Sequence, residues 1–202
     1  MSELPRVSRA PKSPPGGPQA LPPSCQTIAY QWFANRPPQA TAPLPADPPP
    51  LGPSLPPARL LATEANGLPL ILLDCPPLFS RPGNPYLDAL GHDWTDNGIR
   101  FGLLSRVAAL LGQAASPLAW RPDVVHTNDW QTALAPAWLH YEGGAASVVT
   151  VHNIAFQGNF APGYLSALGL PEHAWHMHGV EYHGQLSFLK AGLQLATLIS
   201  TV

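Results

Sequence analysis

Two kinds of hydrophobic spacing alternate along the chain after about residue 60. Short apolar or β-branched runs predict strands. These runs are residues 68–74, 123–126, 147–151 and 198–202. Apolar residues three and four positions apart predict helices. These segments are residues 97–111, 130–140 and 186–196. Strands that alternate with helices favour βαβ units, so the pattern predicts an α/β, Rossmann-like fold with a parallel sheet.

The first 60 residues lack both kinds of spacing. They hold 17 of the 27 prolines of the chain, and proline fixes φ and removes a backbone donor. Their one apolar stretch, Thr27–Phe33, is too short to nucleate a core. We therefore predict a Pro-rich, disordered segment over residues 1–60 and a folded part over residues 61–202. A ligand for proline-reading modules is the alternative, but no basic-flanked PxxP motif supports it.

The composition argues against several classes of partner. A formal net charge of −2 with 11% charged residues offers no basic surface for nucleic acid or an anionic membrane. No apolar run reaches the roughly 18 residues that a membrane span needs, and residues 1–5 lack the basic start of a signal peptide. Cys25 and Cys75 are far apart in sequence, without metal-ligand spacing. This usage predicts a reducing, cytoplasmic setting.

Polar residues follow two of the predicted strands directly. Asp129 and Trp130 come after the strand at residues 123–126, and His152 and Asn153 after the next one. Ligands of open α/β sheets bind outside the carboxyl ends of the strands, so we expect these four side chains to face one crevice. An indole beside an amide and a carboxylate suits a sugar ring, which has an apolar face and a rim of hydroxyls.

Each of these residues also has a purely structural interpretation. Asp129 is a good N-cap for the helix that follows it, His152 fits a hydrogen-bonded histidine at a strand end, and Trp130 fits a core position. The spacing alone leaves both interpretations open.

Several longer motifs are similar to those of one enzyme family. They occur in the same order as in that family and together cover about residues 68–202: Arg81–Tyr86, Gly91–Asn97, Asn128–Leu139, Thr150–Phe160, Leu168–Pro171 and Ser187–Leu193. The segment Thr150–Phe160 matches the family pattern nearly residue for residue. By these motifs the chain resembles the bacterial glycogen synthases and plant starch synthases.

The resemblance implies part of the N-terminal half of a two-domain GT-B glycosyltransferase. Such an enzyme transfers glucose from ADP-glucose to the non-reducing end of an α-1,4-glucan with retention of configuration, without a metal or a further cofactor. By carry-over, His152 and Asp129 would be the catalytic residues, in contact with the transferred or acceptor sugar. Trp130 and Asn153 would line the acceptor site, and Tyr86 would belong to its glucan-facing wall.

The chain departs from the family in two places. The family's Lys-x-Gly-Gly donor loop has no counterpart, because Lys12 and the glycines after it have the wrong spacing. The C-terminal half of the family is also missing, so we expect a fragment with little activity alone. A non-catalytic glucan-binding protein derived from a synthase is the alternative function. The sequence leaves the oligomeric state open, and glycogen or starch as the product.

A histidine cluster suggests a third possibility, a metal site. Its members are His173, His176, His178 and His183. Their spacing matches no standard zinc pattern, so we predict a solvent-facing loop there.

Overall fold

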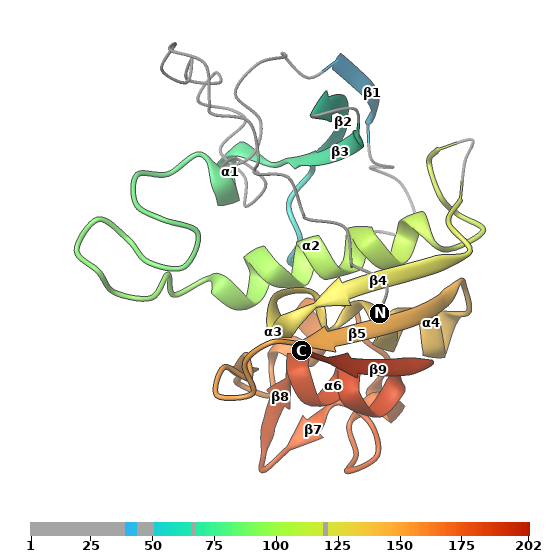
Figure 1. The fold of residues 1–202 in the computed structure, drawn as a ribbon. Coiled ribbons are helices and arrows are strands. Elements are labelled where there is room, and N and C mark those ends of the chain that lie inside the picture. The colour runs from blue at the N-terminus through green and yellow to red at the C-terminus, as the bar shows by residue number, and fades with distance from the viewer. Residues whose placement is uncertain (1–38, 44–50, 66–67, 119–120) are drawn as a thin grey trace, which may run out of the picture.

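A parallel three-stranded sheet forms the centre of the structure, a computed structural model that describes residues 39–43, 51–65, 68–118 and 121–202 (Figure 1). Its strands are β4 (Val124–Asn128), β5 (Ala146–Val151) and β9 (Leu198–Thr201), paired in the order β4-β5-β9. Helices connect the strands in sequence, which confirms the predicted α/β fold with a Rossmann-like parallel sheet.

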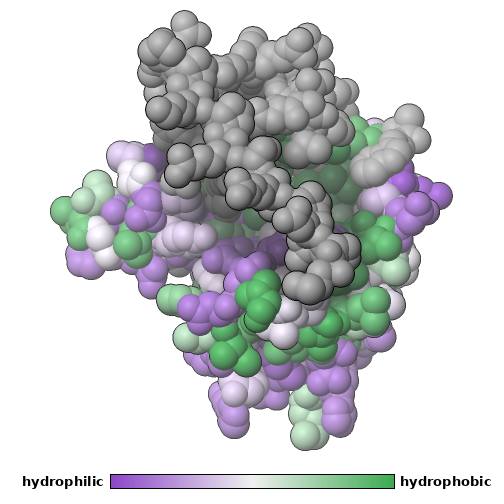
Figure 2. All heavy atoms as spheres, in the orientation of Figure 1, coloured by the Kyte–Doolittle hydropathy of each residue, from purple (hydrophilic) through white to green (hydrophobic). Residues whose placement is uncertain are grey.

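Helices cover one side of this sheet. They are α3 (Asp129–Thr132), α4 (Ala135–Glu142) and α6 (Phe188–Leu195). Val125 and Val149 point to the covered side and are buried, whereas Val124 and Leu198 are exposed. Figure 2 shows hydrophobic residues at the surface around these strands. No helix among the described residues is long and apolar enough to cross a membrane.

Helix α2 (Asn97–Leu111) lies between the parallel sheet and a second, antiparallel sheet (Figure 1). The second sheet contains β1 (Gln39–Pro43), β2 (Arg59–Ala65) and β3 (Leu68–Asp74), in that order. Phe101 belongs to the core beside the parallel sheet, and Leu103 and Val107 belong to the core under the antiparallel sheet. Because α2 is covered on opposite sides, most of its residues are buried, the polar Arg100, Ser105 and Arg106 among them.

The remaining elements are short. They are α1 (Pro76–Phe79), β6 (Asn159–Phe160), α5 (Tyr164–Ala167), the 3-10 helix η3 (Glu172–Ala174), β7 (Glu181–Tyr182) and β8 (Gln185–Ser187). Strands β6, β8 and β7 form a third small sheet in that order. The chain before β6 is fastened to α6, because the amide of Phe188 donates to the carbonyl of Gly158 at 3.0 Å.

The structure corrects two of the predicted helices. The helix predicted over residues 130–140 is two helices, α3 and α4, because the backbone turns at Ala133 and Leu134 and Pro136 starts a new helix. In the last predicted helix, Leu186 lies instead on β8, and the helix begins at Phe188. Ser187 ends the extended backbone there, since its hydroxyl accepts from the amide of Lys190 at 3.3 Å.

The proline-rich segment contains more structure than its composition predicted. Strand β1 lies within residues 1–60 and pairs with β2, and Leu51 is buried in the core under the antiparallel sheet. Ordered structure therefore begins before residue 60. The disorder predicted for residues 1–38 and 44–50 lies outside the described residues.

We expect Gly192→Ala to destabilise the fold, because α6 approaches the end of α3 closely at this residue. A Cβ at residue 192 would lie 2.7 Å from the carbonyl oxygen of Ala133, which is backbone and cannot rotate away. Such overpacking costs about 1–3 kcal/mol, more than the ~1 kcal/mol of helix propensity that alanine adds. Urea unfolding measures the difference.

The matched control is Gly163→Ala, where an added Cβ meets nothing within 4 Å and φ is −59°. Equal unfolding midpoints for the two variants would contradict the close contact between α6 and Ala133.

Candidate active site at the carboxyl ends of the parallel strands

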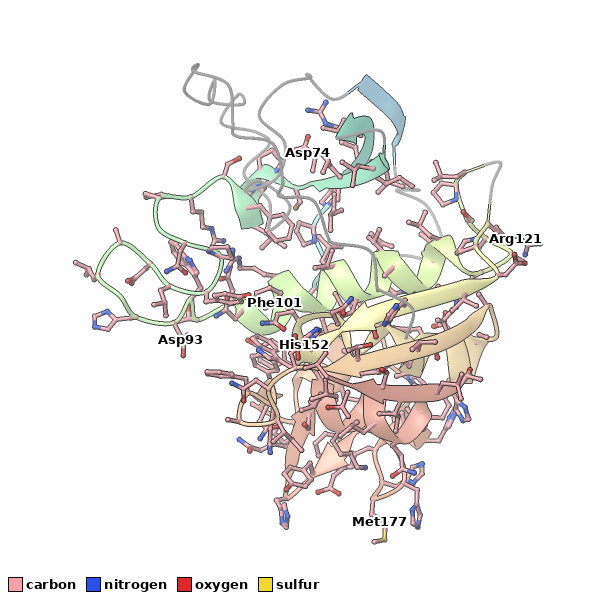
Figure 3. All side chains as sticks on the ribbon, viewed as in Figure 1. Asp74, Asp93, Phe101, Arg121, His152 and Met177 are labelled. Atoms are coloured by element: carbon pink, nitrogen blue, oxygen red, sulfur yellow. The ribbon has the colours of Figure 1, made fainter. Side chains whose placement is uncertain are left out.

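The ends of β4 and β5 bring Asp129 and His152 together. The two strands are parallel neighbours, with Asn128 opposite Thr150, so the residues that follow them lie side by side. Oδ1 of Asp129 accepts from the backbone amide of His152 at 2.7 Å, and Oδ2 lies 3.0 Å from Nδ1 of the His152 ring. The amide of Asn153 also points at Oδ1, at 3.4 Å. Figure 3 shows His152 at this end of the sheet.

The carboxylate of Asp129 bonds to His152 at the end of the neighbouring strand and does not cap helix α3. Helix α3 begins at Asp129 itself, and no side chain caps its N-terminus. Asp129 has a φ of +54°, in the left-handed region that side chains other than glycine rarely adopt. This backbone costs about 1–2 kcal/mol, so the structure holds the carboxylate toward His152 against a local conformational preference.

The pairing with Asp129 also decides which ring nitrogen of His152 is available. An ionised carboxylate only accepts hydrogen bonds, so Nδ1 carries the proton and Nε2 of the neutral ring is left as an acceptor. The side chains of His152 and Asp129 are 46% and 29% exposed, and pairs in such contact with water add little stability. The bond therefore orients the imidazole more than it stabilises the fold.

An aromatic-rimmed pocket of about 660 Å³ lies beside this pair. Two segments far apart in the sequence line it, one with Tyr86, Trp94 and Asn97 and the other residues 155–160, together with Trp130 and Gln131. The structure thus divides the predicted site residues into two adjacent groups. Tyr86 and Trp130 line the pocket, while Asp129, His152 and Asn153 are not among its lining residues and precede the lining residues Trp130 and Ala155 in sequence.

Trp130 is at once a pocket residue and a core residue. Its ring meets Phe101 edge-on at a centroid distance of 4.7 Å and lies 6.3 Å from Phe188. Gly158 covers the ring so closely that a Cβ there would lie 2.3 Å from it. The core interpretation of Trp130 is therefore correct for part of its indole, and the remainder faces the pocket.

The loop that carries Tyr86 is ordered by side chains and backbone turns. The carbonyl of Tyr86 accepts from the amide of Trp94 and from Nδ2 of Asn97, both at 3.1 Å. Hydrogen bonds from the backbone, above all from His92, lower the pKa of Asp88 within the loop. Burial lowers the pKa of the Arg100 guanidinium, which donates 2.8 Å to the carbonyl of Pro85 and remains charged.

Sequence reasoning missed several lining residues of this pocket. They are Leu87, Asp93, Trp94, Asn97, Gln131 and Phe156. Most lie inside the family motifs, which was a usable signal, but nothing in their spacing shows that two distant loops form facing walls. In the structure, Phe156 stands out among them, because 63% of this large apolar residue is exposed.

Two other features of the chain offer weaker sites. A larger hollow of about 930 Å³ lies at the amino ends of β4 and β5, and none of its described lining residues is aromatic. The four histidines of the cluster at residues 173–183 are exposed, as predicted. Within the described part of the chain, no group of three or more His, Cys, Asp or Glu side chains could hold a metal ion.

The geometry suits recognition of a polyhydroxylated ring. Aromatic faces in the pocket can cover apolar ring edges, while amide and carboxylate groups at its border can bind hydroxyls. The imidazole of His152, oriented by Asp129, can accept a hydrogen bond or a proton at its Nε2 atom.

Comparisons with known proteins confirm the resemblance that the motifs indicated. The family model for the starch synthase catalytic domain matches residues 24–202. A glycogen synthase of Dechloromonas aromatica is 71% identical over 162 residues, which are 80% of this chain and 33% of that protein. A glycogen synthase of Nitrosomonas europaea is 56% identical over 147 residues, 72% of this chain and 30% of that protein. The chain spans about a third of the length of these relatives.

A solved structure has the same fold. It is the catalytic domain of starch synthase IV from Arabidopsis thaliana, bound to ADP and acarbose, with a TM-score of 0.57. The match covers 71% of this chain and 30% of that chain, at 22% identity. At this identity the likeness shows the fold alone.

Replacing Asp129 by glycine and by alanine separates the side chain from the backbone. Both variants lose the bonds to His152. The left-handed backbone costs alanine about 1–2 kcal/mol, which exceeds the roughly 0.5–1 kcal/mol of extra entropy that glycine loses. We expect Asp129→Gly to be more stable than Asp129→Ala by up to about 1.5 kcal/mol in urea unfolding. An alanine variant as stable as the glycine variant would contradict the left-handed conformation.

Proposed function

Because the chain belongs to the starch synthase catalytic domain family, we propose that it forms the acceptor-side wall of a retaining α-1,4-glucosyltransferase. The donor in this proposal is ADP-glucose, and the acceptor is the non-reducing end of an α-1,4-glucan. The observation that carries it is the hydrogen-bonded pair of Asp129 and His152 beside a pocket with aromatic walls. Since the bacterial relatives named above are glycogen synthases, we propose glycogen as the product.

Each residue has a role that its surroundings support. Tyr86 and the free part of Trp130 cover the apolar faces of the terminal glucose units. His152 presents Nε2 to a hydroxyl of the transferred sugar, and Asn153 offers an amide to the acceptor. Asp129 orients His152 and places a negative charge where a positive charge develops on the sugar ring during glycosyl transfer.

Donor activation needs groups beyond these. A departing diphosphate requires preorganised positive charge or helix N-termini around it, and such electrostatic stabilisation usually contributes more to catalysis than any other single effect. The residues of this site supply a carboxylate, an imidazole and aromatic rings. We therefore infer that this chain binds the acceptor glucan and, by itself, transfers little glucose.

We also propose a cytoplasmic location. Cys75 is a free, buried thiol, and burial raises its pKa. A thiol kept protonated in the core fits a reducing compartment, where disulfides are rare.

Calorimetric titration of the chain with maltoheptaose tests the acceptor site. We expect saturable binding, and we expect His152→Ala to weaken it about two- to tenfold, the range of one net hydrogen bond. Tyr86→Ala should weaken it at least as much, because a stacking face is lost. Tyr182→Ala is the matched control, since Tyr182 is similarly exposed but does not line the pocket. Absence of binding, or equal loss in the control, would contradict the acceptor role.

Transfer is tested with radiolabelled ADP-glucose and glycogen. We expect the purified chain alone to incorporate no glucose above background, because the diphosphate-stabilising charges are not among its site residues. Incorporation that depends on the chain, and that Asp129→Asn abolishes, would show that a full active site forms without further partners.

A further inference from the structure

Arg81 fastens both ends of the loop that forms one wall of the pocket. Its guanidinium makes two parallel bonds to the carboxylate of Asp96, at 2.9 Å and 2.6 Å. The same group donates to the carbonyl of Pro77 from Nε at 3.0 Å and from Nη2 at 2.7 Å. One side chain therefore ties the end of α1 to the residue before α2. The loop between them carries Tyr86 and Trp94.

Arg81 also reaches Trp94 directly. Its guanidinium carbon lies over the Trp94 ring, 5.0 Å from the centroid, which is within the range of a cation–π contact. Arg100 approaches the same ring at 5.8 Å. Trp94 is half-buried and lines the pocket, and the exposed residue Phe156 lines it from the segment 155–160. Each of the two lining segments thus contributes an aromatic residue, Trp94 or Phe156, that was not among the predicted site residues.

We propose that Trp94 contacts the glucan and that Arg81 is the positioning residue that holds its ring ready for this contact. The inference rests on the proposed acceptor function of the pocket. Among the described residues, and apart from the two arginines, the Trp94 indole has only a long hydrogen bond to hold it, from Nε1 to the carbonyl of Asn84 at 3.4 Å. Without Arg81 the ring would be held more loosely, and ordering it on binding would reduce affinity. The cation over the ring and the bidentate bond to Asp96 order Trp94 before the sugar arrives.

Arginine is required for this arrangement because of its shape. The planar fork of the guanidinium bonds to Asp96 and Pro77 and still presents a flat cation to Trp94. A lysine at residue 81 keeps the charge but has a single compact donor group, so it cannot maintain all three contacts. Arg81→Lys should therefore behave like Arg81→Ala.

A double-mutant cycle on maltoheptaose affinity tests the proposal with the full chain. We expect Arg81→Ala and Trp94→Leu each to weaken binding about three- to tenfold. If Arg81 acts through Trp94, adding Arg81→Ala to Trp94→Leu should produce almost no further loss. A loss of global stability alone would instead weaken both backgrounds equally.

The matched control is Arg59→Ala. Arg59 pairs with Asp74, which is 1% exposed, outside the pocket, so this variant loses stability without touching the pocket walls. We expect it to bind maltoheptaose like the wild type.

Fluorine NMR of the chain labelled with 5-fluorotryptophan reports on the Trp94 ring directly. Arg81→Ala should shift or broaden the Trp94 signal and leave that of buried Trp138 unchanged.

The outcomes separate the two proposals. Normal binding by the wild type with unchanged affinity in Arg81→Ala would overturn the role of Arg81 and leave the acceptor function intact. Equal losses in the wild-type and Trp94→Leu backgrounds would show that Arg81 does not act through Trp94. A wild-type chain that binds no maltoheptaose would overturn the acceptor function and this inference together.

Discussion

The parallel pairing of β4 with β5 determines where Asp129, His152 and Asn153 lie. Parallel neighbours end at the same edge of a sheet, so Asp129 and His152 meet although 23 positions separate them in sequence. The pairing also explains the strained backbone of Asp129, because its carboxylate must turn back across the sheet edge to reach the next strand. A shift of one residue in the register would point these side chains away from each other.

The loops that line the pocket are ordered by side-chain contacts and not by strand pairing. Its walls are irregular loops, which cannot use a strand ladder to satisfy their backbone groups, so side chains take over that task. Arg81 joins the Pro77 carbonyl of α1 to Asp96, Arg100 donates to the loop carbonyl of Pro85, and both guanidinium groups lie near the Trp94 ring. On the opposite wall, Gly158 lets the backbone lie directly on Trp130. The strand ends hold Asp129 and His152, and the loop bonded by Arg81 and Arg100 holds Tyr86 and Trp94.

Local pattern predicted the fold better than it predicted the site. Strand β5 and helix α2 follow directly from runs and periodicity, because their signal lies within single segments. Leu186 was misplaced in a helix because its spacing fits one, whereas the cap at Ser187 decides where that helix starts. Trp94 and Phe156 could not be paired from sequence, since only tertiary structure brings their loops to opposite sides of one pocket.

The family resemblance supplied what physical reasoning on single residues left undecided. Asp129 alone fitted a helix cap and Trp130 alone fitted a core residue, and the structure shows that the second interpretation is partly true and the first is not. Both residues position other groups of the site. Asp129 sets the direction of an imidazole, and Trp130 joins the pocket to the core.

A crystal structure of the chain soaked with maltoheptaose is the decisive experiment for the acceptor site. We expect a glucose ring against Tyr86 and Trp130, with a hydroxyl within hydrogen-bonding distance of Nε2 of His152. A glucan bound instead in the hollow at the amino ends of β4 and β5, with the pocket beside His152 empty, would refute the acceptor site.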